Sequence, residues 1–272
     1  MLKNKIIEGI DNEGAPDEKY YAFDWDDNIV TMPTRILVKD EDGDVVGMST
    51  EDFAKYREII GNEPFEFDGH TIVGYSSDPY KYFGVNGDKQ FIIDAMGAKP
   101  AAAWPDFVEA INNGSIFSIV TARGHTPSVL KEGVYNYIVS NTNGIDSNEL
   151  VKNLEKYRDL NDQGVTSKRE MIREYLDLCK FYPVTHGKGS AAEVEPLKIE
   201  ALKEFVKYVK EMSNHIQKQA FLKNKISNYF VPKVGFSDDD LKNVESVKKH
   251  FEDDPENIIT TYSTKGGIKK EY

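Results

Sequence analysis

The sequence has a single cysteine, no long apolar run and no excess of positive charge. Cys179 stands alone, which excludes an internal disulfide and a thiolate-rich metal site and is consistent with a reducing compartment. No stretch approaches the roughly 18 consecutive apolar residues that a membrane span needs, and the N-terminal residues lack the apolar region of a signal peptide. We therefore expect a soluble, cytoplasmic protein without a membrane partner.

Basic side chains are outnumbered, since 34 lysines and arginines stand against 46 aspartates and glutamates and the formal net charge is −12. A protein that coats nucleic acid needs a surplus of basic side chains on at least one face. Nucleic acid is therefore a disfavoured partner, although the basic stretch KQAFLKNK (218–225) leaves it open.

Two further kinds of site have no signature in the chain. The pattern GxxxxGK[ST] of P-loop kinases is absent. The histidines are scattered without the spacing of zinc ligands, so we expect no zinc site. They are His70, His125, His186, His215 and His250.

The length of 272 residues suits one large domain, or one domain with an insertion. Residues 1–18 are polar and include Gly14 and Pro16, so we expect a flexible N-terminal segment before a folded region over 19–272.

Local patterns predict several elements. Residues 35–49 form two β-rich runs around Asp42-Gly43, a pair that favours a type I′ turn, and we expect this hairpin outside the main sheet. Thr126 and Pro127 are expected as the N-cap and the first residue of a helix. Further patterns predict helices over 105–112, 197–213 and 241–251 and a strand over 258–264.

Three apolar strands end in polar side chains. Asp24 and Asp26 follow one, Thr121 follows another, and Asp238 and Asp239 follow a third. The carboxyl ends of parallel strands share one sheet edge, where open α/β sheets bind ligands, so these groups should converge. Gathered carboxylates repel one another unless a hard cation lies among them, and Mg²⁺ prefers a few carboxylates with water and phosphate oxygens. The pattern predicts a Mg²⁺ phosphate site.

These segments resemble motifs of the haloacid dehalogenase superfamily of phosphohydrolases. FDWDDNIV (23–30) is similar to the first motif, FSIVTARG (117–124) to the second and GFSDDDLKN (235–243) to the fourth. The third motif is one lysine, for which Lys198 is the first choice and Lys188 the second.

The resemblance covers about 20–264 and implies an α/β fold with a three-layer Rossmann-like core, a central parallel sheet and cap insertions. About 90 residues separate Asp24 from Thr121, which is more than a strand-to-helix connection needs. We expect a cap insertion at about 31–100 and a helical insertion at about 141–185.

The chemistry of the first motif can also be read from its residues. The Asp24 carboxylate can attack phosphorus and form an aspartyl-phosphate, while Asp26 can protonate the leaving oxygen and later take a proton from water. Thr121 and Lys198 are expected to bind the phosphate. The expected Mg²⁺ ligands are Asp24, Asp26, Asp238 and Asp239.

Some residues depart from the family or favour an ordinary structural role. Asn28 stands where the family usually has Thr or Val, and Trp25 places a bulky ring in the variable position. Arg123 is expected to be a surface or ion-pair residue, Asp240 to be solvated near a helix start, and His125 to be structural.

The expected function is Mg²⁺-dependent hydrolysis of a small phosphorylated metabolite or nucleotide. One alternative is a polynucleotide 3′-phosphatase, an activity found on the same scaffold. Another is a binding or structural protein that keeps the fold without turnover.

Overall fold

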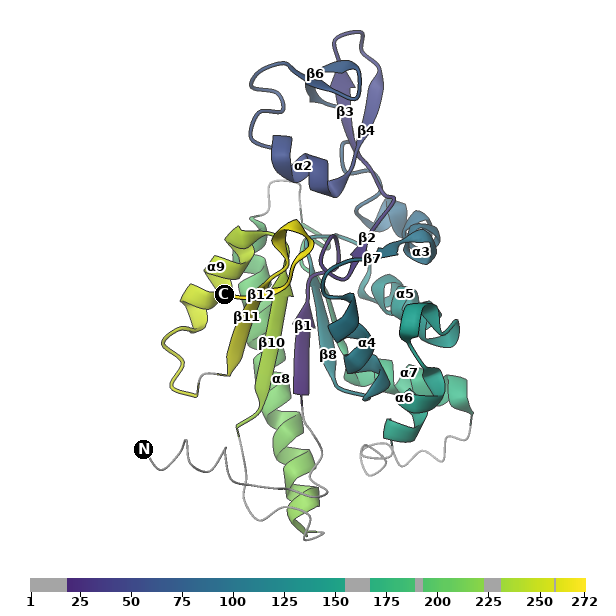
Figure 1. The fold of residues 1–272 in the computed structure, drawn as a ribbon, viewed down its shortest axis with the longest axis vertical. Coiled ribbons are helices and arrows are strands. Elements are labelled where there is room, and N and C mark those ends of the chain that lie inside the picture. Colours follow the sequence, from purple (N-terminus) through teal and green to yellow (C-terminus); the bar gives the residue numbers. More distant parts are fainter. Residues whose placement is uncertain (1–18, 155–166, 189–192, 223–230, 257) are drawn as a thin grey trace.

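The structure, a computed structural model, describes residues 19–154, 167–188, 193–222, 231–256 and 258–272 (Figure 1). The expected flexible segment 1–18 and part of the basic stretch 218–225 lie outside the described residues. Within those ranges, none of the helices combines the length and apolar character that a membrane span requires.

In the described chain, a six-stranded sheet forms the centre of the larger body of the molecule (Figure 1). Its order is β12-β11-β10-β1-β8-β9, and every pair is parallel except β11 with β12. The predicted α/β fold is confirmed, and the sheet, which is expected to be parallel, is parallel except at β12. The strands are β1 (Lys19–Phe23), β8 (Phe117–Thr121), β9 (Lys180–Pro183), β10 (Lys233–Asp238), β11 (Ile259–Ser263) and β12 (Lys270–Glu271).

Helices cover both faces of this sheet. In Figure 1, α4 contacts β1 in front of the sheet, whereas α8 contacts β8 behind it. The predicted helices are confirmed, and α8 is longer than expected. The helices of the body are α3 (Asp88–Gly97), α4 (Trp104–Asn112), α5 (Pro127–Val139), α6 (Ser147–Asn153), α7 (Lys168–Leu178), α8 (Val194–Leu222) and α9 (Leu241–Phe251), with short 3₁₀ turns η1 (Val85–Gly87), η2 (Thr142–Gly144) and η4 (Lys265–Gly267).

Thr126 and Pro127 occupy the predicted positions before and at the first residue of α5. The Thr126 hydroxyl does not cap the helix, however: it donates to Asp88 Oδ2 at 3.1 Å and accepts from Ser128 Oγ at 3.2 Å. A residue type that favours an N-cap has here been recruited to a tertiary contact.

The chain reverses its direction across the sheet at β1. From β1 it proceeds to β8 and β9 on one side, then returns through α8 to β10 and β11 on the other side. The gap between β1 and β10 is therefore the topological switch point, where loops diverge and leave a crevice at the carboxyl ends.

A buried aromatic cluster supports the loop after β1. Trp25 is fully buried, and its ring stacks on Tyr137 at 6.0 Å and tilts against Phe91 at 5.5 Å between centroids. A Trp-to-Ala change at such a site typically costs about 3–5 kcal/mol of folding stability. The bulky ring that departs from the family pattern thus anchors the loop in the core.

A smaller antiparallel sheet lies beyond the carboxyl edge of the main sheet, at the top of Figure 1. We call residues 36–84 the small unit. Its strands surround a separate apolar core built by Val38, Met48 and Ile72. Its elements are β3 (Ile36–Asp40), β4 (Val45–Met48), α2 (Thr50–Tyr56), β5 (Phe65–Phe67) and β6 (His70–Tyr75), and the pair β2 (Val30–Thr31) with β7 (Lys99–Pro100) lies beside its connections.

The hairpin at 35–49 lies outside the main sheet as predicted, but its turn is not type I′. Gly43 has a φ of 89°, whereas Asp42 is not among the residues with positive φ. Residues 41–44 all lie in the loop, which is longer than the two residues of a type I′ turn. The Asp40 carbonyl and carboxylate accept bonds from Gly43 N and Asp44 N and hold this longer loop.

The expected insertions have different boundaries in the structure. Residues 141–185 contain α6 and α7 but also β9, which pairs with β8 and completes the edge of the main sheet. That segment is therefore part of the body, apart from 155–166, which lie outside the described residues. Likewise α3, within the expected cap at 31–100, packs against α5 in the main core.

Candidate active site

Strand register brings the predicted polar groups to one edge of the sheet. Phe23 pairs with Ser237 on one side and with Ile119 on the other. Asp24 therefore stands beside Asp238, and the backbone N–H of Asp24 donates to the Ser237 carbonyl at 2.9 Å. The convergence inferred from the sequence is found at the switch point between β1 and β10.

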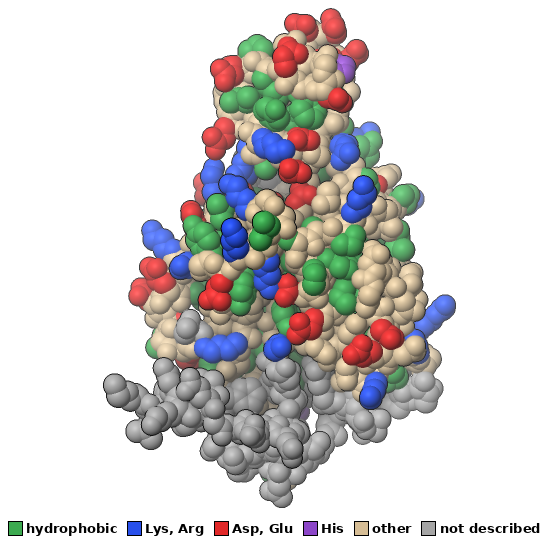
Figure 2. Space-filling model, in the orientation of Figure 1, with side chains coloured by type: hydrophobic (Ala, Val, Ile, Leu, Met, Phe, Trp, Pro, Cys, Tyr) green, Lys and Arg blue, Asp and Glu red, His purple; other side chains and the backbone are tan. Residues whose placement is uncertain are grey.

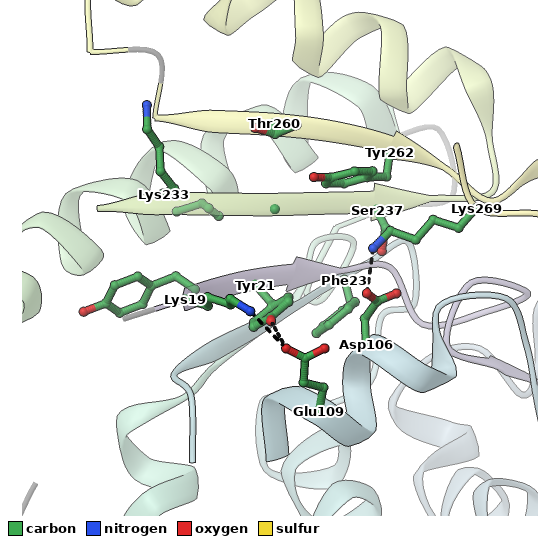
Figure 3. Close-up of a pocket in the computed structure, with 13 residues that line it drawn as sticks. Lys19, Tyr21, Phe23, Asp106, Glu109, Lys233, Ser237, Thr260, Tyr262 and Lys269 are labelled. Carbon is green, nitrogen blue, oxygen red and sulfur yellow. Dashed lines mark hydrogen bonds and ion pairs between the residues drawn. The ribbon is translucent and has the colours of Figure 1, made fainter. Parts of the chain in front are cut away.

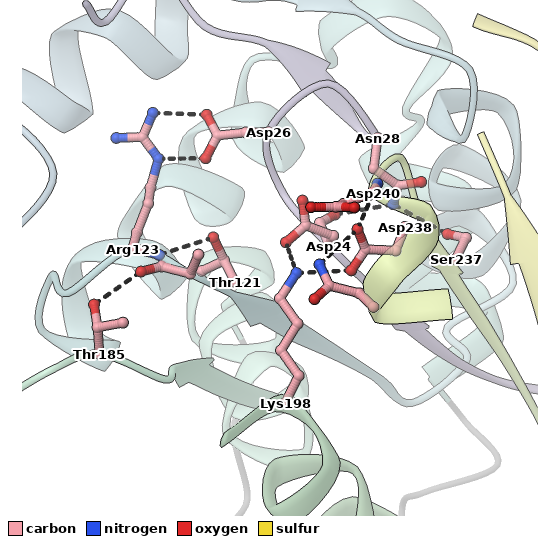
Figure 4. A network of polar contacts seen from close by, with 12 residues as sticks. Asp24, Asp26, Asn28, Thr121, Arg123, Thr185, Lys198, Ser237, Asp238 and Asp240 are labelled. Atoms are coloured by element: carbon pink, nitrogen blue, oxygen red, sulfur yellow. Dashed lines mark hydrogen bonds and ion pairs between the residues drawn. The ribbon is translucent and has the colours of Figure 1, made fainter. Parts of the chain in front are cut away.

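Three carboxylates and one lysine form the centre of this edge, and Figure 4 labels Asp24, Asp238 and Lys198 among them. Asp24, Asp238 and Asp239 each offer an oxygen within 4.8 Å of the others. Lys198, near the start of α8, donates from Nζ to Asp24 Oδ1 at 2.8 Å and to Asp238 Oδ2 at 2.7 Å. The Lys198 side chain is only 2% exposed, so both bonds are shielded from water.

Burial dominates the electrostatics of this centre. It raises the pKa of Asp24 to about 8, because Lys198 only partly offsets the burial and the repulsion from Asp238. Burial, followed by the charges of Asp238 and Asp24, raises the pKa of Asp239 to about 9. Burial disfavours the Lys198 ammonium, but the two carboxylates more than compensate and raise its pKa. One lysine cannot balance three carboxylates when all of them are ionised, so the ionised site is short of positive charge.

Lys188, the second choice for the lysine, lies on the same cleft but is exposed. The geometry favours Lys198 because it is the lysine that bridges the strand-end carboxylates. Thr121 is buried at the end of β8 and lines the cleft, and its hydroxyl accepts a bond from Arg123 N at 3.3 Å.

Asn28 organises the loop that carries Asp24. Its amide nitrogen donates to the Asp24 carbonyl and to Ser237 Oγ, both at 3.0 Å. Its amide oxygen accepts from Thr264 Oγ1 at 2.8 Å. The Thr or Val of the family pattern could not make all three bonds. Asn28 therefore links the ends of β1, β10 and β11 through hydrogen bonds that the family pattern does not provide.

Asn243 was not anticipated from the sequence. Its amide nitrogen donates to Asp238 Oδ1 at 3.1 Å, and Asp240 N donates to the same oxygen at 2.9 Å. The available signal was its place in the first turn of the helix that follows an acidic strand end. Asp240 is the N-cap of α9 as its position suggested, but Arg57 of the small unit binds its carboxylate at 3.0 Å, so it is not simply solvated.

The carboxylate of Asp26 does not join the three carboxylates, which corrects its expected place among the metal ligands. Arg123 binds it through Nε and Nη2, both at 2.7 Å (Figure 4). Of the two roles expected for Arg123, the ion pair is found and the surface position is not, because Arg123 is buried. His125 is also buried. Its two ring nitrogens make hydrogen bonds to Asp88 and Arg123, in keeping with a structural role.

A cleft of about 810 Å³ lies between this edge and the small unit. One wall carries the carboxylates and Lys198, and the opposite wall carries Phe53, Arg57 and Tyr80 of the small unit. Ion pairs join the two bodies, since Arg57 binds Asp240 and Lys242 binds Glu58 at 3.2 Å. The volume is within the range of small-molecule sites.

A second pocket, of about 300 Å³, lies against β1, β10 and β11 (Figure 3). Four of its five charged side chains pair within it: Lys269 binds Asp106 at 2.7 Å and Lys19 binds Glu109 at 3.2 Å. Its lining has no cluster of three carboxylates like the one at the strand ends. The larger cleft, which has this cluster, is therefore the candidate active site.

Comparison of the chain with protein-family models, with curated proteins and with solved structures finds no match. The resemblance to the haloacid dehalogenase superfamily therefore rests on the residues and their arrangement.

Proposed function

We propose that the protein is a Mg²⁺-dependent phosphomonoester hydrolase of the haloacid dehalogenase type, with a three-layer Rossmann-like core and the small unit as its cap. The observation that carries the proposal is the buried Lys198 bridging Asp24 and Asp238 among three carboxylates at the switch point. Phosphoryl transfer depends on positioned positive charge and one nucleophile, and this centre offers both kinds of group.

The first step is attack by Asp24. One of its carboxylate oxygens forms a bond to phosphorus while the bond from phosphorus to the leaving oxygen breaks. The electron pair goes to that oxygen, which takes a proton from Asp26 and departs as an alcohol. A water molecule then attacks phosphorus, gives a proton to Asp26 and releases phosphate from Asp24. The sum is the phosphomonoester and water giving an alcohol and phosphate.

Hard oxygen donors are what Mg²⁺ selects, and the three carboxylates supply them within one 4.8 Å group. Asp24, Asp238 and Asp239 would hold the ion, which when bound supplies positive charge for the phosphate oxygens. Lys198 neutralises part of the carboxylate charge, and the Thr121 hydroxyl can donate to a phosphate oxygen. Asn243 and Asn28 orient Asp238 and the Asp24 loop.

The substrate we propose is a small phosphorylated metabolite or nucleotide, with cytoplasm as the compartment. The small unit carries 11 acidic against four basic side chains, a charge that repels a long polyanion. Figure 2 shows acidic side chains over this unit and side chains of both signs on the body below it. The polynucleotide 3′-phosphatase is thus the weaker alternative.

Trapping of the aspartyl-phosphate tests the proposal. Wild-type protein is mixed with Mg²⁺ and a ³²P-labelled substrate chosen from a panel of metabolites, nucleotides and oligonucleotide ends, and is then quenched in acid. We expect phosphate release and label on the protein, and neither with Asp24→Asn, whose amide is a poor nucleophile. More than a few per cent of wild-type activity in Asp24→Asn, or full activity in excess chelator, would contradict the mechanism.

A further inference from the structure

Arg123 holds the Asp26 carboxylate with two parallel hydrogen bonds. Nε donates to Oδ2 and Nη2 donates to Oδ1, each at 2.7 Å. The Arg123 side chain is 1% exposed, whereas Asp26 is 17% exposed and lines the cleft. A bidentate guanidinium fixes both the place and the plane of a carboxylate, which an ammonium group does not.

The guanidinium is itself held in place on several sides. It lies 4.5 Å from the centroid of the Phe83 ring and 5.4 Å from that of Phe91. Its Nη1 lies 3.3 Å from His125 Nε2, and its Nη2 donates to Thr34 Oγ1 at 3.4 Å. The pair therefore sits in an aromatic and polar frame from the body and the connection to the small unit.

His125 completes this frame as a neutral ring. Burial, followed by the charge of Arg123, lowers the pKa of His125. Its Nδ1 lies 2.9 Å from Asp88 Oδ1, so the proton belongs on Nδ1 and the lone pair of Nε2 accepts from Arg123. The two aromatic rings, Thr34 and His125 thus together fix the orientation of the guanidinium toward Asp26.

A buried ion pair is not needed for stability alone, because apolar residues of similar volume often serve as well. Here the pair is asymmetric: the cation is enclosed and the carboxylate faces the cleft. Each Asp26 oxygen keeps a further lone pair when Arg123 is bound, so a proton can reside there and be delivered.

We propose that Arg123 is a positioning residue that aims Asp26 at the leaving oxygen and neutralises the charge that Asp26 gains when it gives up its proton. This inference rests on the proposed hydrolase function. When the bond between phosphorus and the leaving oxygen breaks, the proton moves from Asp26 to that oxygen. The carboxylate left behind already faces the guanidinium, so no reorganisation is needed.

The leaving group distinguishes this role from a structural one. An alkoxide is a poor leaving anion and needs the proton, whereas p-nitrophenolate is stable without it. Loss of proton transfer should therefore slow an alkyl phosphate far more than p-nitrophenyl phosphate. A structural role of Arg123 would slow both substrates alike, because the whole site would be displaced.

The experiment measures kcat and KM for both substrates with Arg123→Lys, which keeps the charge and loses the fork, and with Arg123→Met. The control is Arg173→Lys, an exposed arginine that pairs with Glu132. We expect kcat for the alkyl phosphate to fall about 100-fold in Arg123→Lys, the lower end of the usual contribution of general acid catalysis, and kcat for p-nitrophenyl phosphate to fall less than about fivefold. Arg173→Lys should change neither.

The double variant Asp26→Asn with Arg123→Lys should be no slower on the alkyl phosphate than Asp26→Asn alone. This comparison does not use Arg123→Met, so it can be made even if Arg123→Met does not fold. Equal losses on both substrates, no loss, or additive losses in the double variant would overturn the positioning role while leaving the hydrolase intact. A wild-type protein that hydrolyses neither substrate with Mg²⁺ would refute the proposed function, and this inference with it.

Discussion

Replacing Lys198 by Met is the change that tests the charge balance of the site most directly. The substitution keeps an unbranched side chain of similar length and removes the cation that binds Asp24 and Asp238. Removing one partner of a buried ion pair typically costs about 3–5 kcal/mol, because the other charge stays buried and unpaired. Lys198 is 2% exposed, so little of this cost is relieved by solvent.

The pH dependence has a defined sign. The pKa of Lys198 is raised by folding, so its contribution is fully present below the pKa of the unfolded lysine, and it persists throughout pH 5–8. Asp24 and Asp239 have raised pKa values, about 8 and about 9, so the folded state keeps protons that the unfolded state has lost above about pH 4. Their effect makes stability fall as pH rises from there toward pH 9, and the fall should be steeper without Lys198.

The assay is urea unfolding of both proteins at pH 5 and pH 8, with and without Mg²⁺. We expect Lys198→Met to lose about 3–5 kcal/mol at pH 8 and less at pH 5, and Mg²⁺ to restore part of the loss. Lys203→Met, an exposed position on the same helix, should stay within about 0.5 kcal/mol of wild type. A loss below about 1 kcal/mol at pH 8 would show that Lys198 is not the counter-charge we describe.

Three further predictions concern turnover. Asp26→Asn should lower kcat about 10²–10⁴-fold and leave KM nearly unchanged in steady-state assays, whereas a parallel loss of binding would indicate a structural role. Asp238→Ala should raise the Mg²⁺ concentration for half activity, and Ca²⁺ should inhibit because its larger, looser shell does not keep octahedral geometry; unchanged metal titrations would count against this ligand. Small phosphomonoesters should show a higher kcat/KM than oligonucleotide 3′-phosphates at two salt concentrations, and the reverse order with a steep salt slope would favour the polynucleotide enzyme.

The strand ends were predictable because their signal is local. An apolar run followed at once by carboxylates marks the end of a buried strand, and parallel neighbours must then share an edge. This reasoning placed Asp24 and Asp238 together before their register was known. Lys198 could be chosen only from its place at the start of the helix predicted over 197–213, yet the fold buries it between those two carboxylates. The catalytic role of each residue stays a prediction.

The remaining features depend on contacts between distant segments. Asp26 and Arg123 are 97 residues apart, and neither local sequence shows that the guanidinium is buried or that it faces this carboxylate. The four residues of β9 come directly after α7 and include Lys180 and Pro183. The charged, helix-like sequence around them therefore gave no sign of an edge strand. At Asp42-Gly43 the dipeptide was informative, but the loop length, set by pairing of the flanking strands, decided the turn.

The shortage of positive charge connects the stability of the site to its chemistry. A nucleophilic carboxylate must be ionised, but burial alone would keep Asp24 protonated near neutral pH. Lys198 offsets only part of this cost, and the charges of Asp238 and Asp26 add to it. A bound divalent cation would lower the pKa values of Asp24 and Asp239 and so favour the ionised, reactive form of Asp24. We therefore expect one metal concentration to govern two measurements, the stability of the folded chain above about pH 8 and the onset of phosphate release. Both depend on ionisation of the same buried carboxylates, Asp24 and Asp239.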